Sequence, residues 1–183
     1  MNANPAPIDS DREFRNALGA FGTGVTVITT RAADGSLHGL TANSFSAVSL
    51  QPRLVLWSQS LRTPSHSVFE GATHFAINVL SVDQVDLSRR FARSASDKFA
   101  GLAVTHGIGG SPLLPGAVAT FECRAAARHP GGDHVIHVGE VLRFACSDGT
   151  PLLFVRGRYQ TGRDLEANPR PDADLESAWG GLS

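Results

Sequence analysis

The sequence has little of what marks several large classes of protein. Only two of its 183 residues are cysteines, too few for a disulfide framework or a four-thiolate metal site. No apolar run approaches the roughly 20 residues of a membrane span, and the first residues lack the basic start and apolar centre of a secretory signal. The net charge of −1 argues against binding nucleic acid or anionic lipid by bulk charge. We therefore expect a cytoplasmic protein with no membrane or nucleic-acid partner.

The chain does contain enough apolar sequence, 42% of its residues, to fill the core of one domain. Residues 1–9 and 163–183 are rich in Pro, Asp and Asn. We expect these two segments to be tails on either side of a single domain at residues 10–162.

Three short helices are predicted from capping patterns. Segments 10–13 and 81–84 have the Ser-x-x-Glu/Gln spacing of a capping box, and the second predicts a helix that runs through Phe91. Thr63–Pro64 has the pattern of an N-cap followed by proline at the first helical position, which predicts a helix to about Glu70.

Seven further segments have the β-branched or alternating composition of strands. Asp34–Gly35 and Ser147–Gly149 have turn compositions, and we expect each to join two strands as a hairpin. Strands do not alternate regularly with helices, so an antiparallel barrel, whose closure removes exposed edges, fits better than a doubly wound parallel sheet. The predicted strands are 25–30, 37–49, 54–58, 74–80, 118–128, 134–145 and 151–160.

Familiar cofactor and metal motifs fail on their context. Gly22–Gly24 and Gly107–Gly110 resemble dinucleotide loops, but neither follows a strand and opens a helix. His129, His134 and His137 are spaced H-x4-H-x2-H, yet the last two point to opposite faces of an extended strand, so we expect no metal site. Both cysteines lie in strand-like segments, and we expect buried structural thiols.

Two stretches, 39–46 and 57–63, are dense in small hydroxyl and amide residues. Small side chains let a flat ring approach backbone N–H groups, while hydroxyls, Arg62 and a helix N-terminus favour phosphate. Ordinary loop composition explains the same residues, so both interpretations stay open. In Gly131–His134, a Gly-Gly turn places the titratable ring of His134 at the start of a strand, a position from which it can project into a cleft. The alternative is a hairpin tip at which His134 is solvated.

Taken in order, these segments resemble the flavin reductase family of split-barrel flavin-binding proteins. The resemblance extends from about residue 12 to residue 161, which is nearly the whole expected domain. It is carried by Phe21–Val27, Gly39–Phe45, Val48–Leu50, Phe75–Leu80, Arg90–Phe91, Asp97–Phe99, Glu122–Cys123, Gly131–His134, Val138–Val141, Pro151–Leu153 and Gly157–Tyr159.

The resemblance implies a mainly β protein, an antiparallel split barrel with a few short helices that forms a homodimer. It implies that the protein binds FAD or FMN and takes electrons from NADH, or from NADPH. Reduced flavin would then leave for a separate oxygenase, the second component of a flavin-dependent monooxygenase.

The resemblance also implies site residues by position. His134 would be the catalytic residue, orienting the nicotinamide, and Tyr159 would close the same region. The isoalloxazine would contact the segment made of Thr41, Ala42, Asn43 and Ser44. The remaining cofactor-binding positions, from the ribityl phosphate to the distal end of the flavin, would be Ser58, Gln59, Ser60, Thr63, Ser65, Arg90 and Phe91.

Two other classes of function remain as alternatives. A barrel of the same kind that holds flavin tightly would be an electron carrier or sensor, and rapid turnover of added free flavin separates it from a reductase. An oligonucleotide-binding barrel needs exposed aromatic side chains and a basic groove, and a near-neutral chain with one Tyr and two Trp supplies little of either.

Overall fold

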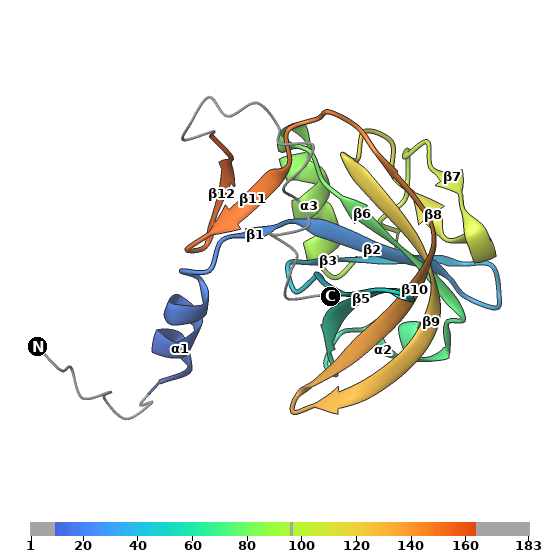
Figure 1. Ribbon diagram of the computed structural model, residues 1–183, viewed down its shortest axis with the longest axis horizontal. Helices are drawn as coiled ribbons and strands as arrows, with labels where there is room; N and C mark the ends of the chain where they lie inside the picture. Colours follow the sequence, from blue (N-terminus) through green and yellow to red (C-terminus); the bar gives the residue numbers. More distant parts are fainter. Residues whose placement is uncertain (1–9, 96, 164–183) are drawn as a thin grey trace, which may run out of the picture.

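The computed structural model describes residues 10–95 and 97–163, and its centre is a seven-stranded antiparallel sheet (Figure 1). The strand order is β3-β2-β6-β9-β10-β5-β4. Although β3 and β4 are the two edges of the sheet, only residues 43–45 separate them in the chain, so the sheet curls round on itself. The predicted antiparallel split barrel is confirmed. Its strands are β2 Thr26–Arg31, β3 Leu37–Ala42, β4 Ser46–Leu50, β5 Arg53–Ser60, β6 His74–Val79, β9 Ala119–Gly131 and β10 His134–Cys146.

A smaller sheet forms an arm that projects from the barrel. In it β1 (Thr23–Gly24) pairs with β11 (Leu152–Val155), which pairs with β12 (Arg158–Thr161). Helix α1 (Asp11–Leu18) precedes β1, stands away from the barrel in Figure 1 and has no buried residue. Its N-cap is Ser10, as the sequence predicts. The arm therefore leaves an amphipathic helix exposed in the single chain.

Two further helices lie against the barrel. The 3₁₀ turn η1 (Val82–Gln84) leads into α3 (Val85–Ala92). Ser81 and Gln84 form the predicted capping box, in which Ser81 N donates to Gln84 Oε1 at 3.0 Å.

None of the helices in residues 10–95 and 97–163 is long and apolar enough to cross a membrane.

The helix predicted at Pro64 begins later than expected. Helix α2 spans His66–Gly71, because the chain makes two turns first: Thr63 N donates to Ser60 O at 3.0 Å, and His66 N donates to Thr63 O at 2.9 Å. The residues between β5 and α2 therefore form a tight segment, 61–65, rather than a first helical turn.

Three strand predictions needed correction. Segment 37–49 breaks at 43–45 into β3 and β4, and 151–160 breaks at a tight turn, where Arg156 and Gly157 have φ of 49° and 75°. The hairpin predicted at 147–149 is wrong, because β10 pairs with β9 and β5 whereas β11 leaves the barrel to pair with β1. The glycine-rich segment after α3 contains β7 Thr105–His106, η2 Ile108–Gly110 and β8 Pro112–Leu113.

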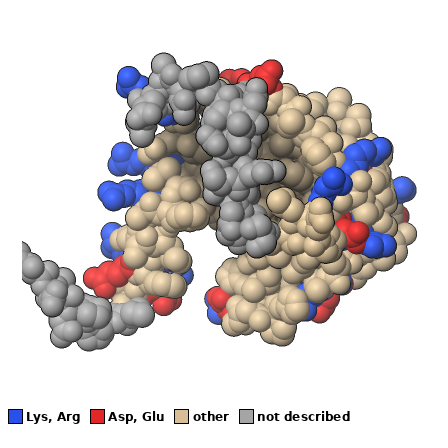
Figure 2. Space-filling view, viewed as in Figure 1, with Lys and Arg blue, Asp and Glu red and all other residues tan. Residues whose placement is uncertain are grey.

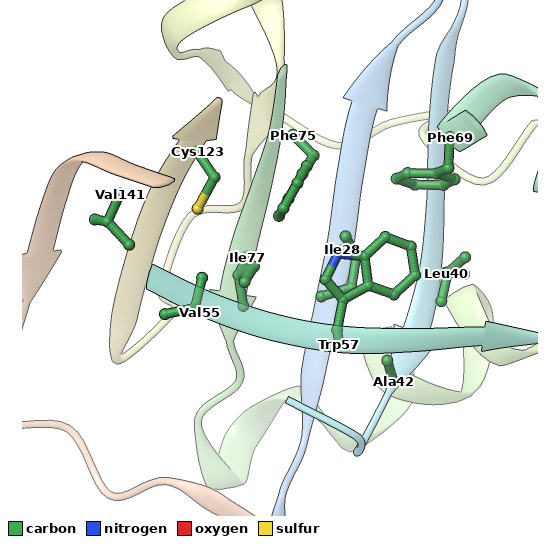
Figure 3. Packing of buried hydrophobic residues seen from close by; sticks show 10 residues of the cluster. All are labelled: Ile28, Leu40, Ala42, Val55, Trp57, Phe69, Phe75, Ile77, Cys123 and Val141. Carbon is green, nitrogen blue, oxygen red and sulfur yellow. The ribbon is translucent and has the colours of Figure 1, made fainter. Parts of the chain in front are cut away.

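The barrel interior is filled by aromatic and aliphatic side chains around Trp57 (Figure 3). Phe69 of α2 and Phe75 of β6 meet the indole edge-on, at ring-centroid distances of 5.2 and 5.9 Å. A second apolar cluster, which includes Phe91, joins α3 to the barrel and the arm. The first cluster fixes β5 and α2, and the second fixes α3.

One row of side chains crosses three strands beneath α2. Arg128 of β9 is paired with His137 of β10, which is paired with Trp57 of β5. The imidazole stacks on the indole, with centroids 4.3 Å apart and planes within 10°. Burial first, and then the positive charges of Arg128 and His66, lower the pKa of His137 from 6.5 to about 4. The fold therefore holds His137 neutral at pH 7.

The two cysteines differ in their surroundings. Cys123 is buried in the barrel, and burial raises the pKa of its thiol to about 12. Cys146 is exposed, which corrects the expectation of two buried thiols. The reason is that β5 pairs with β10 only as far as Glu140, so the end of β10 is not covered by that strand.

The lowered pKa of His137 predicts a loss of stability in acid. As pH falls from about 6.5 towards 4, the His137 imidazole is protonated in the unfolded chain but stays neutral in the folded chain. The free energy of unfolding therefore decreases over this range. The variant His137→Phe keeps a ring against Trp57 but has no group that titrates there. Between pH 7 and pH 4, we expect its free energy of unfolding to fall by about 3 kcal/mol less than that of the wild type. Denaturant titrations at both pH values measure this difference, and equal losses in the two proteins would contradict it.

Candidate functional site

A cavity of about 840 Å³ opens at one end of the barrel, between β3, the end of β5, segment 61–65 and the residues that follow α3. Of the predicted cofactor-binding residues, it brings together Thr41, Ser60, Thr63, Ser65 and Phe91. The volume lies in the usual range for pockets that hold small ligands.

The charge of this cavity has one sign. Arg62, Arg93 and Lys98 line it, and the described lining residues include no Asp or Glu. Lys98 is held in place, because its Nζ donates to Gly39 O at 3.1 Å and to Phe91 O at 3.0 Å. Burial lowers the pKa of the Lys98 amine. Such a wall suits an anionic ligand.

The hydroxyl groups of the cavity are placed by local turns. Ser60 is the last residue of β5, and its Oγ accepts from Arg62 N at 3.3 Å. The turns at Thr63 and Ser65 then bring two more hydroxyl side chains to the same wall before α2 begins. Hydroxyls beside a guanidinium are a common donor set for phosphate oxygens.

Gly39 is required where the cavity meets α3. A Cβ at this position would lie 2.6 Å from Cε1 of Phe91, and the Phe91 ring is itself buried edge-on against Phe99 at a centroid distance of 5.0 Å. The missing side chain lets β3 and α3 approach closely enough for Lys98 to bond to both.

A hydrogen-bonded chain joins Thr41 to Tyr159, two predicted site residues that are far apart in sequence. Thr41 Oγ1 donates to Ser88 O at 2.6 Å, and Ser88 Oγ lies 3.0 Å from Tyr159 Oη. Ser88, which the sequence analysis did not identify, is fully buried at the centre of this link. These contacts tie β3 to α3 and to the arm, and they connect Tyr159, which is not among the described lining residues, to Thr41 of the cavity wall.

A second link joins the 41–44 segment to β5. Ser44 Oγ accepts from Ser58 N at 2.9 Å and donates to Ser58 O at 3.1 Å. These bonds bring two predicted flavin-contacting residues together, although neither lines the cavity. They bridge the place where β3 passes to β4.

His134 lies at the head of β10, opposite Ser60 in the strand register. Its Nδ1 is 2.7 Å from Asp133 Oδ1, and the side chain is 43% exposed. The hydrogen bond from His134, followed by its charge and that of Arg62, lowers the pKa of Asp133. The predicted catalytic residue is therefore paired with Ser60 of the cavity wall but is not itself among the described lining residues, and one of its ring nitrogens contacts Asp133.

Four predicted site residues lie elsewhere. The side chains of Ala42 and Gln59 point into the barrel and are 8% and 1% exposed, so only their backbone is available to a ligand. Asn43 lines a different cavity of about 760 Å³ between α1 and the β11–β12 turn. The Arg90 guanidinium bonds to Ala100 O and so holds the loop after α3.

The comparison with protein families decides what this barrel is. The model of the flavin reductase like domain matches residues 18–163. The chain belongs to this family.

Individual family members support the assignment. The FMN reductase (NADH) SmoA of Agrobacterium fabrum is 52% identical over 151 residues, which cover 82% of this chain and 86% of that protein. The reductase component of the flavin-dependent trigonelline monooxygenase of Acinetobacter baylyi is 42% identical over 84% of this chain, which spans about half (50%) of that relative. The NADH:FAD oxidoreductase SgcE6 of Streptomyces globisporus C-1027, solved with NAD and FAD fragments, superposes with a TM-score of 0.81 at 34% identity, over 94% of this chain and all (100%) of that chain.

In this member of the flavin reductase like family, the sequence analysis named Arg62 as a residue that favours phosphate but gave no site role to the two other cations of the cavity, Arg93 and Lys98. Lys98 is the only lysine in the chain, and it and Arg93 lie beyond the end of α3, so only the fold brings them to β3. Their signal in the sequence is weak, because fifteen arginines are spread along the chain and nothing local marks Arg93.

The histidine series does not converge in the structure. His137 is buried under α2, whereas the His134 side chain is 43% exposed, as the alternation along a strand requires. Within residues 10–95 and 97–163, no three His, Cys, Asp or Glu side chains are grouped so that they could hold a metal ion.

Proposed function

We propose that this chain is an NADH-dependent flavin reductase, which reduces FAD or FMN and releases it to a separate monooxygenase component. The observation that carries the proposal is the basic cavity, whose described lining residues include no Asp or Glu and whose Ser60 is paired with His134. The activities of the relatives support it: one is an FMN reductase that uses NADH, and another is the reductase component of a monooxygenase.

The residues of the cavity suit a flavin nucleotide. Ser60, Arg62, Thr63 and Ser65 present hydroxyl and guanidinium donors for phosphate, and no described carboxylate in the wall would repel it. Lys98 adds positive charge from the side of α3. The isoalloxazine would lie against the backbone of 41–44, beside Ser58, with Phe91 and Tyr159 supporting that region from α3 and the arm.

The two nucleotides would supply the redox chemistry. In the reaction NADH + H⁺ + oxidised flavin → NAD⁺ + reduced flavin, hydride passes from nicotinamide C4 to flavin N5, and solvent supplies the proton. Holding two reactants in contact can supply about 7–11 kcal/mol of barrier reduction, so the chain needs no acid or base of its own. His134 would orient the nicotinamide, and its contact with Asp133 would fix the ring.

Release of reduced flavin is the feature that separates this function from a carrier or sensor. Hydroxyl, guanidinium and backbone contacts hold a ligand without a covalent bond, which suits exchange. The tightly binding carrier remains the alternative function.

Turnover of free flavin tests the proposal directly. NADH oxidation is followed anaerobically at 340 nm, with either FAD or FMN in excess over protein. A reductase oxidises many equivalents of NADH per protein only when flavin is added, and the faster flavin is its substrate. Consumption of about one equivalent by a yellow protein would favour the carrier, and no dependence on flavin would exclude both.

The role of His134 is tested by its removal. We expect His134→Ala chiefly to raise the KM for NADH, on the order of tenfold if one or two hydrogen bonds to the nucleotide are lost, while the Kd for flavin stays close to wild type. Steady-state kinetics gives the first quantity and fluorescence titration the second. An unchanged KM for NADH with intact flavin binding would remove His134 from the nicotinamide site.

We also propose that the chain works as a cytoplasmic homodimer. Figure 2 shows α1 separated from the barrel by a gap, with basic side chains along the outer edge of the molecule on the same side. Exposed apolar side chains gather on α1 and at the ends of β4 and β10, and a second copy would cover them. They are Phe14, Leu18, Leu50, Leu142 and Phe144.

Sedimentation equilibrium tests the dimer. The expected mass is twice the 19.3 kDa of one chain. A species of 19.3 kDa at micromolar concentration would contradict it.

A further inference from the structure

The short helix α2 is attached to the barrel at few points. Of its described residues Phe69 alone is buried, and this ring meets Trp57 edge-on at 5.2 Å. A helix of six residues has little stability of its own, so its position depends on such contacts. What holds α2 therefore also sets the direction in which segment 61–65 enters it.

Arg128 supplies a second attachment, at the C-terminal end of the helix. From β9, its Nη2 donates to Phe69 O at 3.2 Å and to Ala72 O at 2.5 Å. Ala72 O follows the last turn of α2, where a helix leaves carbonyl acceptors unpaired and a cation is favoured, whereas Phe69 O also accepts from Ala72 N at 3.3 Å.

The Arg128 side chain belongs to a row of three side chains on neighbouring strands. Arg128 of β9 is paired with His137 of β10, and His137 is stacked on Trp57 of β5. Because His137 is neutral, no second positive charge lies beside Arg128 in this row. The row formed by Arg128, His137 and Trp57 ends under α2.

Segment 61–65 is tied to the start of α2 by backbone bonds. His66 N donates to Thr63 O at 2.9 Å, and Phe69 N donates to Ser65 O at 3.2 Å. Thr63 and Ser65 line the basic cavity, whereas Arg128 is not among its described lining residues. A shift of α2 would move these two hydroxyls, although Arg128 itself would touch no ligand there.

We propose that Arg128 is a positioning residue for the flavin site: its two hydrogen bonds to the end of α2 hold Thr63 and Ser65 where they bind the flavin phosphate. The inference rests on the proposed function, since it assumes that flavin occupies the basic cavity. It assigns to a residue outside the cavity an effect on flavin affinity that is separate from any effect on NADH.

Arg128→Met tests this, because methionine keeps much of the apolar stem and removes both donors. We expect the Kd for FAD or FMN, measured by fluorescence titration without NADH, to rise roughly tenfold, as the loss of two modest hydrogen bonds would allow. The KM for NADH at saturating flavin should stay within about twofold, as should kcat. Arg128→Lys, which keeps one charged donor, should have an intermediate Kd.

The matched control is Arg124→Met on the same strand. Arg124 is exposed and pairs with Glu140 on the barrel surface, so its loss should leave the Kd for flavin and the KM for NADH unchanged. Thermal melting of each variant shows whether the protein is folded at the assay temperature. If Arg128→Met does not fold, the Kd of Arg128→Lys alone decides, and a wild-type value overturns the proposal.

The other outcomes are also decisive. A wild-type Kd in folded Arg128→Met, or equal rises in the flavin Kd and the NADH KM, overturns the positioning role while the reductase function stands. If wild-type protein itself binds neither FAD nor FMN, the proposed function fails, and the role of Arg128 fails with it.

Discussion

The alternation of side chains along β5 is the constraint on which the rest of the site depends. Trp57 and Gln59 point into the barrel, so Ser58 and Ser60 face the other side. Trp57 supports α2 through Phe69 and is itself stacked on His137. A shift of one residue in the register of β5 would bury the serines and expose the indole, which is why the core and the site are specified together.

The positive charge of the cavity comes from two segments of the chain. One is the segment after β5, and the other is made of the residues after α3. The ammonium group of Lys98 donates to two backbone carbonyls rather than to a carboxylate. The described wall therefore keeps its positive charge for a ligand. The buried link from Thr41 through Ser88 to Tyr159 holds α3 at the distance that this arrangement needs.

Local signals in the sequence predicted local structure well. The spacing of Ser81 and Gln84 located the start of η1 and α3, and the predicted strand 54–58 lies within β5, Arg53–Ser60. The alternation of side chains along β5 would have placed Gln59 in the core, but the sequence analysis did not apply it to that residue. The prediction of a hairpin at 147–149 was wrong because β11 pairs with β1, about 130 residues earlier in the chain. No local sequence pattern indicates a pairing over such a distance. Lys98 and Arg93 were not predicted as cavity residues for the same reason, because their position at the cavity depends on how α3 packs on β3.

The proposed function requires the flavin phosphate to bind in the basic cavity beside β5. A crystal structure of the protein with FAD or FMN would show where the phosphate binds. We expect phosphate oxygens at about 2.7–3.2 Å from donors among Ser60, Arg62, Thr63 and Ser65. A phosphate bound instead beside Arg15 and Arg156, in the cavity between α1 and the β11–β12 turn, would contradict it.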